Sequence, residues 1–147
     1  MKNVIIKNSL IINANRGKVA SILKDVRNFS DCIPNVISSR TEGSKFSGKV
    51  RFKIGSVSGT FDVDGEILEK EPERAYDFYI KSGTSGNIIE TKGTITLSDA
   101  DNGKTLLEYH AEAKLGGMIA ALGKIIESTS NDLIKQMFSC IEQKISK

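Results

Sequence analysis

The stretch that most constrains the fold of this chain runs from Gly116 to Ile145. Its apolar residues follow one another at steps of three, four or seven, which places them on one face of an α-helix. They are Ile119, Leu122, Ile126, Leu133, Met137, Ile141 and Ile145. A helix of this length spans about 45 Å, enough to cross a small domain. Because the sequence before it is typical of strands, we expect the helix to lie along one face of a curved antiparallel sheet.

The middle of the chain changes to a period of two, in which apolar or small residues alternate with polar ones. This alternation predicts strands over residues 46–54, 57–65, 76–80, 89–97 and 107–115, after a first strand over 4–12. Asn15 can cap a short helix, and a second short helix should end at Ile33, because Pro34 disfavours helix in the residue before it. The predicted fold class is α+β. A curved antiparallel sheet of about six to seven strands wraps around a long C-terminal helix, with two short helices after the first strand.

Length and composition are those of a single soluble domain over residues 1–147. Of the 147 residues, 39% are hydrophobic and 27% are charged. No window of about 18 residues is apolar and uncharged, and Lys7 and Asn8 interrupt any apolar core of a secretion signal. We therefore expect a cytoplasmic protein without a transmembrane segment. Cys32 and Cys140 match no metal or redox spacing, and two free thiols are expected rather than a bridge.

Charge is unevenly spread along the sequence, although the net charge is only +3. A basic row on one predicted strand precedes an acidic row on the next, so the two rows can face each other as cross-strand pairs. The rows are Lys49, Arg51 and Lys53, and Asp62, Asp64 and Glu66. No aromatic residues interleave with the basic ones, so binding to nucleic acid is not expected.

No arrangement of residues typical of an active site is found. His110, the only histidine, falls on the outward face of its strand, so no histidine-based triad is available. Gly117 and Gly123 have the wrong spacing for a phosphate-binding loop, and Ile125 stands where that loop needs Ser or Thr. The acidic residues over 62–77 occupy outward strand positions and do not converge on a metal. We expect no enzymatic activity, no metal and no cofactor.

Several segments spread over nearly the whole chain match a known family. They are Leu23 to Asp25, Cys32 to Asn35, Phe46 to Gly55, Gly65 to Glu69, Gly103 to Tyr109 and Leu115 to Gly123, the last being the most specific. The order of elements resembles the helix-grip, START-like (SRPBCC) superfamily, and the segments resemble its CoxG family, named after the G subunit of carbon monoxide dehydrogenase. The resemblance implies a protein that accompanies a molybdenum hydroxylase in its maturation or membrane association. Longer members carry a tail that has been linked to the membrane; because this sequence stops at Lys147, only peripheral membrane contact is expected.

A cavity between the sheet and the C-terminal helix is the predicted binding site. Small residues recur on both walls, at Gly48, Gly59, Gly65, Gly93, Ala111, Ala113, Gly123 and Ser130. The resemblance to the START-like superfamily also implies a cavity at this place. The predicted lining consists of Phe52, Phe61, Phe78, Ile89, Thr91, Leu107, Tyr109, Ile119, Leu122, Gly123, Ile126, Ser130 and Leu133. The predicted mouth consists of Gly55, Ser85, Gly86, Gly117 and Met118, where apolar anchors are few.

Three functions remain open from the sequence. The first is a non-enzymatic carrier or accessory protein that holds a small apolar molecule for a molybdenum-hydroxylase-type enzyme. An apolar lining without inward Lys or Arg favours a lipid, isoprenoid or quinone-like ligand over a nucleotide. The second is a docking or maturation module of the same fold that needs no ligand. The third is a polyketide-cyclase-like enzyme, which would use Tyr109 together with an inward carboxylate.

Overall fold

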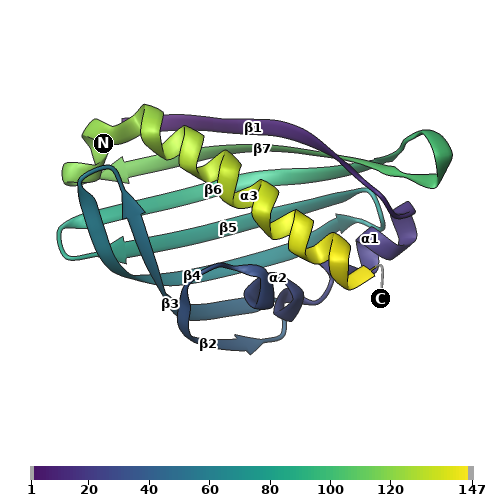
Figure 1. Ribbon diagram of the computed structural model, residues 1–147, viewed down its shortest axis with the longest axis horizontal. Helices are drawn as coiled ribbons and strands as arrows, with labels where there is room; N and C mark the ends of the chain where they lie inside the picture. Colours follow the sequence, from purple (N-terminus) through teal and green to yellow (C-terminus); the bar gives the residue numbers. More distant parts are fainter. Residues whose placement is uncertain (1, 146–147) are drawn as a thin grey trace.

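The computed structural model describes residues 2–145 and consists of one antiparallel sheet with helices on one face (Figure 1). The elements are β1 (Lys2–Ile12), α1 (Arg16–Leu23), α2 (Val26–Cys32), β2 (Val36–Glu42), β3 (Lys45–Ile54), β4 (Val57–Glu71), β5 (Ala75–Thr84), β6 (Asn87–Asp99), the 3₁₀ turn η1 (Asp101–Gly103), β7 (Thr105–Gly116), the 3₁₀ turn η2 (Met118–Leu122) and α3 (Gly123–Ile145). The seven strands lie in the order β1-β7-β6-β5-β4-β3-β2. Strands β2 to β7 are neighbours in chain order, and β1 pairs with β7 at the edge of the sheet opposite β2.

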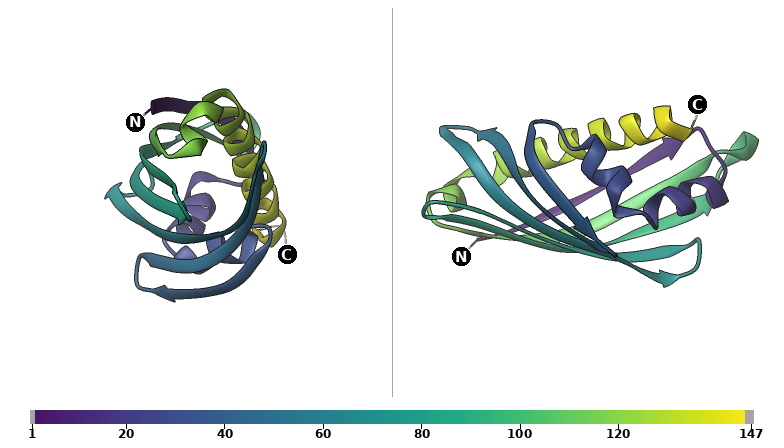
Figure 2. Two further views of the ribbon diagram at one scale, coloured as in Figure 1. Left: turned by 90° about the vertical axis from the view of Figure 1, so that its left-hand side faces the viewer. Right: turned by 90° about the horizontal axis from the view of Figure 1, so that it is seen from below.

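The sheet curves around α3, which crosses it diagonally from β1 towards α2 (Figures 1 and 2). α1 and α2 cover the same face near the end of α3. This arrangement confirms the predicted α+β fold with a long C-terminal helix on a curved antiparallel sheet.

The alternation in the sequence decides which side of each strand is buried. On β3, Phe46, Val50 and Ile54 are buried, whereas the lysines between them are exposed. His110 is exposed on β7, between the buried Tyr109 and Ala111. Its predicted outward position is confirmed.

The cross-strand charge pairing is present only in part. Lys49 lies opposite Asp62, and its Nζ is 2.7 Å from the carboxylate Oδ1. Arg51 and Lys53 instead lie opposite the hydroxyl residues Thr60 and Ser58. Only Lys49 and Asp62 lie opposite each other. From this pair the basic residues continue towards the β3–β4 turn, whereas the acidic residues continue away from it.

The first short helix begins, and the second ends, where the sequence indicates. The Asn15 side chain accepts a hydrogen bond from the backbone N–H of Lys18 at 2.9 Å and caps α1. Asp25 caps α2 in the same way through the N–H of Arg27. α2 ends at Cys32, one residue before Ile33 takes up an extended conformation ahead of Pro34.

The predicted helix from Gly116 is divided into two parts. β7 continues through Gly116, and Gly117 then turns the chain with φ 86°, a conformation that favours glycine. Any side chain at Gly117 would also collide with the backbone carbonyl of Gly86. The turn η2 follows, and Asn87 holds it by accepting a hydrogen bond from the N–H of Ile119 at 2.9 Å. The regular helix starts only at Gly123.

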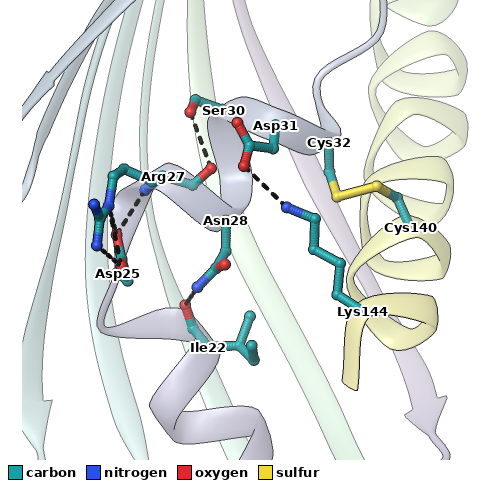
Figure 3. A network of polar contacts seen from close by, with 9 residues as sticks. All are labelled: Ile22, Asp25, Arg27, Asn28, Ser30, Asp31, Cys32, Cys140 and Lys144. Atoms are coloured by element: carbon teal, nitrogen blue, oxygen red, sulfur yellow. Dashed lines mark hydrogen bonds and ion pairs between the residues drawn. A yellow bond between two sulfur atoms is a disulfide. The ribbon is translucent and has the colours of Figure 1, made fainter. Parts of the chain in front are cut away.

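The expectation of two free thiols is wrong, because Cys32 and Cys140 form a disulfide (Figure 3). Their Cα atoms are 5.7 Å apart although 108 residues separate them in sequence. The physical reason is that α2 packs against the C-terminal half of α3. Spacing along the chain gives no sign of this contact.

Candidate ligand-binding cavity

An apolar cavity of about 160 Å³ lies between the inner face of the sheet, α2 and the C-terminal half of α3. From the helices it is lined by Val26, Phe29, Ile33, Ile134, Met137 and Phe138, and from the strands by Phe46, Val63, Gly65, Glu66, Ile67, Phe78, Ile80, Ile95 and Tyr109. Ile80 lines the cavity and keeps 37% of its surface exposed, so the cavity opens to solvent beside β5.

The helical wall of the cavity is built by contacts between α2 and α3. Phe29 and Phe138 meet edge to face with their ring centroids 5.9 Å apart, a favoured geometry for aromatic pairs. The disulfide between Cys32 and Cys140 joins the same two helices. α2 thus presents its apolar side chains to the cavity only while it stays against α3.

Two glycines on the sheet shape the floor of the cavity in opposite ways. A Cβ at Gly93 would lie 2.6 Å from Cζ of Phe78, so the missing side chain lets that ring lie across the sheet. A Cβ at Gly65 would make only ordinary contacts, at 3.7 Å from the carbonyl oxygen of Tyr79 and 3.8 Å from Cγ1 of Ile80. Gly65 therefore leaves volume that a larger residue could occupy.

Few polar groups border the cavity. The hydroxyl of Tyr109 donates a hydrogen bond to Oδ1 of Asn131 on α3 at 2.7 Å, and burial raises the pKa of Tyr109. The carboxylate of Glu66 accepts a hydrogen bond from the hydroxyl of Ser44 at 3.2 Å. A ligand in this cavity would meet carbon almost everywhere, with the tyrosine hydroxyl as the nearest neutral polar group.

The structure brings Phe78 and Tyr109, of the predicted lining, into this cavity. The rest lie outside it. Phe52 and Phe61 meet edge to face with their centroids 5.5 Å apart, and a Cβ at Gly123 would already lie 3.3 Å from Cγ2 of Val4. Leu107, Ile119 and Ile126 are buried in the core, and Ile89, Thr91, Leu122, Ser130 and Leu133 are half-buried away from the lining.

None of the residues of the predicted mouth lines this cavity. Gly86 and Gly117 are in direct backbone contact, so the β5–β6 turn is packed against the start of η2. Ser85 lies in the same turn, and Met118 follows Gly117 with 73% of its surface exposed. Gly55 faces Leu122, which would lie 3.3 Å from a Cβ at that position.

Sequence reasoning missed the contribution of α2 and of the second half of α3. Phe29, Ile134 and Phe138 line the cavity, and none was among the predicted lining residues. A signal for the α3 pair exists, since Ile134 and Phe138 each follow a residue of the predicted apolar row and widen it on one side. For Phe29 the only signal is an apolar residue on a short helix of unknown position.

The chain has the START-like, helix-grip fold. A conserved protein from Geobacillus kaustophilus is similar with a TM-score of 0.86 and 24% identity, over 97% of this chain and 95% of that one. The Zhui aromatase/cyclase from Streptomyces sp. R1128 matches with a TM-score of 0.68 and 11% identity, over 98% and 94% of the two chains. A START superfamily protein from Mycobacterium smegmatis matches with a TM-score of 0.65 and 11% identity, over 97% of each.

Residues 9–146 match the family model of CoxG, the G subunit of carbon monoxide dehydrogenase. The chain belongs to this family, as its sequence segments indicate. A search of curated proteins returned no match. Within residues 2–145, no helix is both long and apolar enough to span a membrane.

Proposed function

We propose that this protein is a non-enzymatic carrier or accessory protein that holds an apolar ligand and serves a molybdenum-hydroxylase-type oxidoreductase. The observation that carries the proposal is the apolar cavity between the sheet, α2 and α3, with a volume of about 160 Å³. Cavities of about 150 Å³ lined by Leu, Ile and Phe stay dry and bind benzene. This volume suits one ring or the end of a hydrocarbon chain.

A lipid, isoprenoid or quinone-like molecule would place one apolar end in the cavity. Its remainder would leave through the opening beside Ile80, which is 37% exposed. Tyr109 is the neutral polar group nearest to such a ligand. Its hydroxyl donates to the amide oxygen of Asn131, whereas Glu66, the carboxylate in the lining, accepts from Ser44. Tyr109 is therefore not paired with this carboxylate, which supports a binding role over the cyclase alternative.

The partner and the compartment are further parts of the proposal. Family membership supports association with carbon monoxide dehydrogenase or a similar molybdenum enzyme. We propose the cytoplasm as the place where the two meet.

The test is binding of fluorobenzene, a single apolar ring, followed by fluorine NMR. We expect the parent to bind and Gly65→Val to weaken binding at least tenfold, because the valine side chain would enter the cavity. Gly83→Val is the matched control: Gly83 also lies on the sheet, outside the cavity lining, and a Cβ there meets only the carbonyl oxygen of Asn87 at 3.5 Å. No binding by the parent, or equal binding by Gly65→Val, would refute the proposal. Native mass spectrometry of the purified protein then reports any larger ligand that it retains.

One observation favours the docking module as the second candidate. Ile125 is 41% exposed beside the β3–β4 turn, and Met118 is 73% exposed at the start of η2, which gives this part of the molecule exposed apolar side chains. Met118→Asp should then abolish comigration with the purified molybdenum enzyme in gel filtration, whether or not fluorobenzene binds. Unchanged comigration of Met118→Asp would exclude this surface.

A further inference from the structure

Contacts of three kinds join α2 to α3 at the wall of the cavity, and Figure 3 shows two of them, the disulfide and the ion pair. The disulfide joins Cys32 to Cys140, and Nζ of Lys144 lies 3.1 Å from Oδ2 of Asp31. The rings of Phe29 and Phe138 form the third contact. Of the three, only the disulfide is covalent, and the Asp31 carboxylate is 65% exposed, so its ion pair is weak and screened by salt.

The residues next to the disulfide line the cavity. Ile33 follows Cys32 directly, and Met137 lies one helical turn before Cys140. α2 has seven residues, and a helix this short is not stable without tertiary contacts. The position of α2, and with it one wall of the cavity, therefore depends on its attachment to α3.

We propose that the redox state of the Cys32–Cys140 disulfide controls access to the cavity. In the oxidised protein α2 is held against α3, and the cavity is reached through the opening beside β5. Reduction loosens α2 and widens access from the side of the helices. The inference rests on the proposed function, since it assigns a regulation to the same site.

The reductant is a dithiol, either a small molecule or a cellular dithiol protein. Its thiolate attacks Sγ of Cys140, because Cys140 is more exposed than Cys32. A mixed disulfide forms between the reductant and Cys140, and Cys32 leaves as a thiolate. The second thiol of the reductant then attacks the mixed disulfide and releases Cys140. The protein gains two thiols and two electrons, and the dithiol becomes a disulfide. A disulfide in a reducing compartment is exposed to this exchange.

Met137 provides a measurement of access that needs no ligand, because this residue lines the cavity and carries an oxidisable thioether. Dilute hydrogen peroxide converts methionine to its sulfoxide, and peptide mass spectrometry gives the rate at each methionine. Met118, 73% exposed, is the reference within the same chain. The parent is compared with the double variant Cys32→Ser, Cys140→Ser, in which no thiol competes for peroxide.

We expect Met137 to be oxidised at least tenfold faster in the double variant, relative to Met118. Hydrogen exchange should show a matching loss of protection in α2 while the amides of β7 keep theirs. Lys144→Ala, which removes only the ion pair, should change the Met137 rate less than twofold. Should the serine variant not fold, Cys32→Ala with Cys140→Ala takes its place, because Cys32 is buried among apolar residues.

Equal rates of Met137 oxidation in the parent and the double variant would refute redox control of access to the cavity. So would an equal rise in exchange of β7 and α2, since that means general unfolding. These outcomes leave fluorobenzene binding by the parent untouched. Failure of the parent to bind fluorobenzene would instead refute the proposed function, so the two failures can be told apart.

Discussion

The two ends of α3 meet the sheet in different ways. At its first turns the helix packs closely on β1: a Cβ at Gly123 would lie 2.9 Å from Cε of Lys2, and Ile126 is 2% exposed. At its other end, Ile134 and Met137 border an open volume. We call these the packed end and the cavity end. The same helix and the same sheet thus give a solid core at one end and a cavity at the other.

The difference shows what small residues do in this fold. Ala111 and Ala113, 2% and 0% exposed on β7, lie on the inner face of the sheet, and like Gly123 they let the backbones approach and close the gap. The cavity instead occurs where large side chains meet, with Phe29, Phe138 and Phe78 around it. These rings surround the space without filling it, and Gly65 leaves part of the cavity floor without a side chain.

The largest effect should follow from a charge introduced at the packed end. Ile126→Asp buries a carboxylate without a partner, which should lower the free energy of unfolding by about 3–5 kcal/mol. Glu127→Asp is the control, because Glu127 is exposed one position further along α3. Urea unfolding followed by circular dichroism measures both variants. Equal stability of the two would contradict the packing of α3 on the sheet.

Truncating an isoleucine at each end tests the comparison directly. Ile119 is fully buried in η2, just before the packed end of α3, and Ile119→Ala should cost about 3–4 kcal/mol, since a new cavity forms there. Ile134 is half-buried beside an existing cavity, and Ile134→Ala should cost about 1–2 kcal/mol, because fewer contacts are lost. Urea unfolding measures both losses of stability, from the shift in midpoint when the denaturant dependence of the unfolding free energy (m-value) is unchanged. A larger loss for Ile134→Ala would mean that the cavity is filled or collapsed in solution.

The sequence predicted the fold better than the site, and the reason is physical. Strands and helix faces follow from local periodicity, so the inward position of Phe46 and the outward position of His110 could be predicted. A cavity depends on where α2 lies relative to α3, which is decided by contacts far apart in sequence. The bond between Cys32 and Cys140 is the clearest case, because 108 residues separate two cysteines that meet in space.

A leucine at Gly123 decides whether the packed end is solid. The sequence alone suggested that Gly123 borders empty volume, in which case a leucine would stabilise the protein. In the structure a Cβ there lies 2.9 Å from Cε of Lys2, the flexible end of a side chain that can move aside, but also 3.3 Å from Cγ2 of Val4. The longer leucine side chain must therefore displace β1, and overpacking of this kind costs about 1–3 kcal/mol. Lys2→Ala in the same background should recover part of the loss, because it removes the nearer contact. Thermal unfolding of the single and double variants measures both, and a higher midpoint for Gly123→Leu than for the parent would show that the first turns of α3 border a cavity as well.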